Sequence, residues 1–131
     1  MGFGSRKNWW AKVIFLTLFA PLLVYAFSSS PPLAVTGGFG EQNCTECHVG
    51  TLNSGPGSVT ITAPLTYSSG QTYQITVRVE DSNRIRWGFE LATRDQQGQQ
   101  AGSLESTDSS TRVRTFSNGV QYVSHQDAPI A

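Results

Sequence analysis

The residues best suited to chemistry lie in one five-residue run, Cys44-Thr45-Glu46-Cys47-His48. Two thiols at this spacing on one turn can form thioether bonds with the two vinyl groups on one edge of a porphyrin, and the adjacent histidine then lies beneath the iron. In this interpretation Cys44 and Cys47 attach one covalent haem c, and Nε2 of His48 is an axial ligand. The spacing therefore predicts a c-type haem site.

Three other uses of the same cysteines are weaker. A thioredoxin-type redox disulfide would require a βαβ context with a helix beginning at the first cysteine, and the sequence shows neither. A structural zinc site would require four ligands, usually in two separated pairs. A structural disulfide between Cys44 and Cys47 would close a very short loop and stabilise little.

The N-terminal segment has the layout of a signal peptide. Its basic start contains Arg6, Lys7 and Lys12, and the apolar run from Val13 to Phe27 leads into Ser28. This run of 15 residues is shorter than the roughly 20 that a membrane-spanning helix needs. We expect cleavage after Ser28 and a location in the bacterial periplasm or on the cell surface. The alternative is an uncleaved N-terminal anchor, which would be the chain's only membrane contact.

The second axial ligand follows by elimination. The usual ligands are Met, His and Lys, but Met1, Lys7 and Lys12 all lie in the segment that we expect to be removed. His125 is then the candidate that remains. The alternative is an ordinary surface histidine in a polar stretch.

Composition limits the mature chain to one small domain. Removal of residues 1–28 leaves 103 residues (131 minus 28), which can build only a modest core. The mature chain has six arginines and nine acidic residues, which gives a formal charge of minus three. This charge does not favour nucleic acid binding, which requires a basic surface.

Alternating apolar and polar residues predict short strands after an extended lead-in, residues 29–57, that carries the haem turn. The polar stretch 96–110 is expected to be a surface loop, and Asn118-Gly119 is typical of a tight hairpin turn. Several strands without an amphipathic helix favour an all-β antiparallel sandwich. The predicted strands are 58–63, 73–80, 86–94, 112–116 and 120–124.

Four side chains near the third predicted strand have two possible roles each. Arg84 and Arg86 could pair with haem propionates, or they could lie on a solvated turn. Trp87 and Phe89 could pack on the porphyrin face, although a place in the sandwich core is the simpler expectation.

Several spaced motifs resemble bacterial Reelin-domain-like proteins of the choice-of-anchor V type. They are the Gly40–Gly50 run around the cysteines, Asn53-Ser54-Gly55 with Gly57, the Gly70–Ile75 strand entry and Arg86-Trp87-Gly88-Phe89. The resemblance implies an immunoglobulin-like β-sandwich on the outer side of a bacterial envelope, with the haem motif before its first strand. Such domains usually continue through further strands, so we expect the sandwich at 58–131 to be incomplete and its open edge to be available for strand pairing with another chain.

These features favour a monohaem electron carrier of the cell envelope rather than an enzyme, with a redox protein as its partner. Two alternatives remain open. The chain could be a surface binding or adhesion module in which haem is mainly structural, since small domains gain much from a crosslink. It could also be a haem sensor with an open iron face if His125 is not a ligand.

Overall fold

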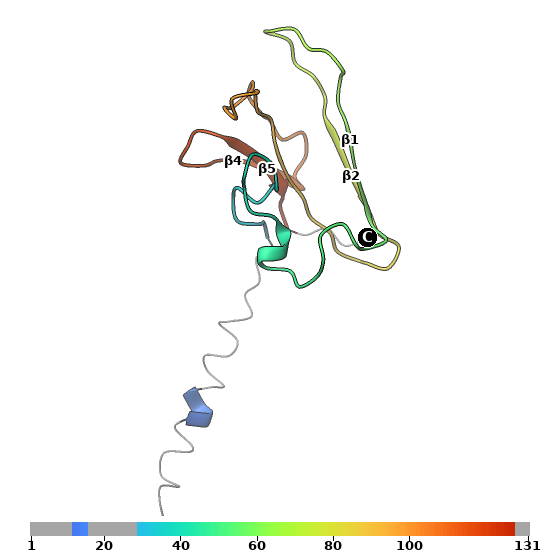
Figure 1. The fold of residues 1–131 in the computed structure, drawn as a ribbon, viewed down its shortest axis with the longest axis vertical. Coiled ribbons are helices and arrows are strands. Elements are labelled where there is room, and N and C mark those ends of the chain that lie inside the picture. The colour runs from blue at the N-terminus through green and yellow to red at the C-terminus, as the bar shows by residue number, and fades with distance from the viewer. Residues whose placement is uncertain (1–11, 16–28, 128–131) are drawn as a thin grey trace, which may run out of the picture.

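The computed structural model describes residues 12–15 and 29–127 (Figure 1). The predicted signal peptide, residues 1–28, therefore lies outside the described residues except for one helical turn at 12–15. Within the described ranges, no helix has the length and apolar character to cross a membrane.

The described chain forms two antiparallel sheets and very little helix, which confirms the expected all-β class. One sheet is the hairpin of β1 and β2, and the other has the strand order β3-β5-β4. Figure 1 shows the β1–β2 hairpin standing beside the three-stranded sheet. The strands are β1 Ser58–Thr62, β2 Thr76–Glu80, β3 Glu90–Ala92, β4 Thr111–Thr115 and β5 Gln121–His125.

The β4–β5 hairpin forms at the predicted turn. Gly119 has a φ of 84°, a left-handed conformation that glycine adopts without steric cost. The Phe116 N–H donates to the carbonyl of Val120 at 2.8 Å, and the side chain of Asn118 accepts from the Val120 N–H at 3.0 Å. Asn118-Gly119 therefore fixes the register in which Val113 lies opposite Val123.

The third predicted strand, 86–94, is longer than the observed β3. The interruption has a specific cause at its N-terminal side, because the Phe89 N–H donates to Nδ1 of His125 at 3.2 Å instead of to a neighbouring strand. At the other end, Arg94 forms only an isolated bridge with Gln100. Regular pairing is therefore confined to Glu90–Ala92.

The core is small and is centred on β5. Val120 and Tyr122 are the buried hydrophobic residues among those described, and Ser124 is fully buried beside them. Trp87 and Phe89 were expected in the core, but their side chains are only half-buried. A domain with so little buried apolar surface depends more than usual on polar contacts.

The start of the lead-in lies across the three-stranded sheet, and we call residues 29–35 the strap. Arg112 donates to the carbonyl of Ser29 at 2.9 Å, and Ser30 Oγ lies 3.4 Å from Ser124 Oγ. Val35 N–H donates to Oε2 of Glu90 at 2.8 Å. Contacts to β3, β4 and β5 together hold the strap in place.

Glu90 is a titratable group that the strap contacts directly. Its pKa is raised, chiefly because burial disfavours the charged carboxylate, while the Val35 N–H and the positive charge of Arg114 act in the opposite direction. A carboxyl that binds its proton more tightly when folded contributes stability at pH values below its unfolded pKa. That contribution is lost as the pH rises through the folded pKa.

We therefore expect Glu90→Gln to stabilise the protein increasingly between about pH 4 and about pH 7, relative to wild type. Urea unfolding midpoints across this range measure the difference. Glu105→Gln, at an exposed position in the loop after β3, is the matched control and should show no such trend. A difference between wild type and Glu90→Gln that stays constant with pH would contradict the expectation.

Candidate haem-attachment site

The cysteine motif forms a single 3₁₀ turn, η2, at Cys44–Glu46. Asn43 caps it, because its Oδ1 accepts from the Thr45 N–H at 2.9 Å and from the Thr45 hydroxyl at 2.7 Å. The Cys47 and His48 N–H groups both donate to the carbonyl of Cys44, at 3.3 and 2.9 Å. Backbone bonds and the Asn43 cap thus fix the conformation of the turn that carries Cys44, Cys47 and His48.

The side chains of Cys44, Cys47 and His48 are all exposed to solvent. Cys44 and Cys47 are free thiols rather than a disulfide. In residues 12–15 and 29–127, no group of three or more His, Cys, Asp or Glu side chains is placed to hold a metal ion, so the zinc alternative gains no further ligands there. The donor set is one that fits thioether attachment, because two accessible thiols precede an accessible imidazole.

A buried charged cluster connects this turn to the sheet, and we call Glu41, Arg94 and Tyr122 the anchor cluster. Glu41 forms an ion pair with Arg94 and accepts from the Tyr122 hydroxyl. The side chains of Glu41 and Arg94 are only 9% and 8% exposed. Glu41 lies three residues before Cys44. The cluster therefore attaches the chain immediately before η2 to β5 through Tyr122, and to the segment after β3 through Arg94.

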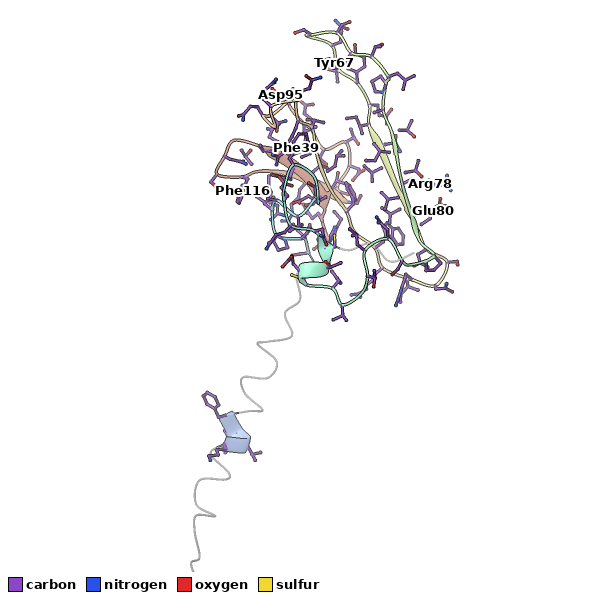
Figure 2. All side chains as sticks on the ribbon, viewed as in Figure 1. Phe39, Tyr67, Arg78, Glu80, Asp95 and Phe116 are labelled. Carbon is purple, nitrogen blue, oxygen red and sulfur yellow. The ribbon has the colours of Figure 1, made fainter. Side chains whose placement is uncertain are left out.

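Aromatic contacts complete the anchor cluster. The Arg94 guanidinium lies 5.4 Å from the ring centroid of Phe39 and 5.7 Å from that of Tyr122, distances at which a cation is attracted to an aromatic face. Figure 2 shows Phe39 beside the three-stranded sheet. No sequence pattern predicts this cluster, because Glu41, Arg94 and Tyr122 are far apart in the sequence and match no spacing rule.

His125 lies at the end of β5 and is half-buried. Its Nδ1 is 3.2 Å from the N of Phe89 and 3.4 Å from the O of the same residue. Nδ1 can therefore form a hydrogen bond in either tautomer: it accepts from the Phe89 N–H when unprotonated and donates to the Phe89 carbonyl when protonated. If Nδ1 carries the proton and donates to the Phe89 carbonyl, Nε2 keeps a free lone pair, which is the form that a metal-binding histidine needs.

Gly88 makes room for the His125 ring. A Cβ at position 88 would lie 2.3 Å from Cε1 and 2.4 Å from Nδ1 of His125, closer than any real contact. Glycine at position 88, within the predicted strand 86–94, thus leaves the space that the imidazole of His125 occupies.

The motif residues share one turn, whereas His125 has separate surroundings. Along β5, the side chains of Tyr122 and Ser124 contact Glu41 and Ser30 of the lead-in. Since successive side chains of a strand point to opposite faces, His125 belongs to the other face, where it contacts Gly88 and Phe89. No hydrogen bond or ion pair links His125 to η2 or His48 within the described residues.

The two arginines considered as propionate partners, Arg84 and Arg86, are exposed. Arg84 lies in a turn in which its N–H donates to the carbonyl of Asp81 at 3.2 Å. The position of Arg84 fits a solvated turn, whereas Arg86 lies at an isolated β-bridge position, and a role of either toward propionates stays a prediction.

Comparisons with protein-family models, with curated proteins and with solved structures found no significant match to this chain.

The anchor cluster gives a stability prediction. Arg94→Met leaves the Glu41 carboxylate buried without its charged partner, and we expect a loss of about 3 kcal/mol in the free energy of unfolding. Arg78→Met is the matched control, because the Arg78–Glu80 pair on β2 is exposed (69% and 53%) and its loss should have no measurable effect. Urea denaturation measures both.

A double variant tests whether the loss of stability comes from the unpaired charge of Glu41. Glu41→Leu with Arg94→Met removes both charges, so it should recover part of the stability that Arg94→Met loses. The cluster is not an anchor if Arg94→Met and Arg78→Met unfold at the same urea concentration.

Proposed function

We propose that this chain is an exported monohaem c-type protein that transfers electrons in the bacterial cell envelope. The observation that carries the proposal is η2, where Cys44, Cys47 and His48 lie exposed on one capped turn with both thiols free. Haem bound there supplies a one-electron redox centre. An immunoglobulin-like sandwich of Reelin type remains the proposed family of the fold.

The chain's own residues have distinct parts in this function. Cys44 and Cys47 would hold the haem through thioether bonds, and Nε2 of His48 would supply an iron ligand. Asn43 and Thr45 hold the turn in the conformation that presents all three groups, and Glu41 attaches it to the sheet. The exposure of the turn gives a redox partner direct access, which suits transfer between proteins.

Two observations favour the alternatives. The scarcity of buried apolar residues suits a domain that haem mainly stabilises, as crosslinks do in undersized domains. The placement of His125 on the face away from the lead-in suits an open iron site. The experiments below distinguish these functions.

Attachment is tested by producing the full chain in a host with a cytochrome c maturation system. We expect a haem-stained band on a denaturing gel at the mature mass, with an N-terminal sequence beginning after Ser28, because attachment follows export. Cys44→Ser combined with Cys47→Ser should abolish the stain, since no thioether can form. Glu46→Gln, in the same turn, is the matched control and should keep it. Wild-type protein that purifies without haem would refute the proposal.

The second ligand is tested by spectroscopy of the oxidised protein. If His125 binds iron, wild type is low-spin, and His125→Ala becomes high-spin and binds carbon monoxide rapidly when reduced. Gly88→Ala should produce the same change without removing the imidazole, because the added methyl group occupies its position. Gly55→Ala, where a Cβ meets nothing closer than 4.0 Å, should leave the spectrum unchanged. Wild type that is already high-spin would favour the open site.

A further inference from the structure

The outer edge of β1 has no partner in the described structure. β1 pairs only with β2, and all five of its residues are exposed. Apart from those in the β1–β2 ladder, no hydrogen bond within residues 12–15 and 29–127 involves the backbone of 58–62. An edge of this kind presents a row of free N–H and C=O groups that can pair with another strand.

The other sheet edges carry protection that β1 lacks. β2 contains the charged pair Arg78 and Glu80, which Figure 2 shows on the hairpin. β4 contains Arg112 and Arg114, and its Thr111 carbonyl already accepts from Ser106 at 2.9 Å. β3 is only three residues long. Charges and short length are the usual means by which proteins prevent edge pairing.

The sequence of β1, Ser-Val-Thr-Ile-Thr, contains no charge, proline or glycine. β-branched residues fill four of its five positions, and such residues favour strands. Val59 and Ile61 are 64% and 55% exposed and lie on one face, opposite Val79 and Val77 of β2. This strand is therefore both free to pair and suited to pairing.

We infer that two copies of this chain associate through antiparallel pairing of β1 with β1. A two-fold axis at Thr60 places Val59 of one copy opposite the partner's Ile61, and Ser58 opposite the partner's Thr62. The strand is self-complementary in this register, as a symmetric dimer requires. The product is a four-stranded sheet, β2-β1-β1-β2, with the apolar residues continuous on one face.

Five-residue strands bury little surface, so the dimer belongs to the small, reversible class of interfaces. It forms and dissociates with concentration rather than being permanent. None of the five β1 residues belongs to the anchor cluster or to η2. The inference is thus independent of whether haem is attached.

The test is sedimentation velocity of the exported chain over a concentration range up to roughly 100 µM, a range that detects association of micromolar strength. We expect a concentration-dependent shift from monomer to dimer. Thr60→Lys should abolish the shift, because it places two like charges opposite each other at the axis. Thr76→Lys, which adds the same charge on the same face of the hairpin but on β2 opposite Thr62, is the matched control and should still dimerise.

A crosslink confirms the register. Thr60→Cys should form a disulfide with its own counterpart under mild oxidation, because directly opposed residues have Cβ atoms about 5 Å apart. Mass spectrometry of the linked peptides distinguishes this bond from any at Cys44 or Cys47. Wild type that stays monomeric throughout the concentration range overturns the inference, and so does a dimer that Thr60→Lys leaves intact.

Discussion

The ion pair between Glu41 and Arg94, with Tyr122 completing it, is the contact on which the rest of the arrangement depends. A domain whose described core holds only two buried hydrophobic residues cannot position an exposed turn by apolar packing alone. The anchor cluster instead joins three distant parts of the chain through charge and hydrogen bonding in a poorly solvated place. Such pairs contribute less to net stability than to a unique arrangement, and their disruption is costly because a buried charge is left alone.

This constraint explains how an exposed site can still be well defined. Cys44, Cys47 and His48 face solvent, yet Asn43 closes their turn and Glu41 holds the preceding residues on the sheet. The proposed haem site would need access for the attachment machinery and for a redox partner, together with a fixed histidine. Local capping supplies the geometry, while the anchor cluster supplies the attachment to the domain.

Sequence patterns predicted the parts that local rules govern. The Asn118-Gly119 turn, the alternation at 58–62 and 76–80 and the all-β class all follow from residue type and period. The pairing of Glu41 with Arg94, the strap over β3 to β5 and the partner of Glu90 depend on which distant segments meet, and no spacing rule contains that information. Glu41 could have been noticed only as an acidic residue close to the motif.

The third predicted strand shows where a local rule fails for a reason that bears on function. Residues 86–94 have the two-residue period of a strand, but the half that contains Gly88 and Phe89 is diverted to accommodate the imidazole of His125. Departures from local preference are expected at functional sites, where another requirement competes with regular structure. The diverted segment therefore fixes the imidazole of His125 between Gly88 and the backbone of Phe89.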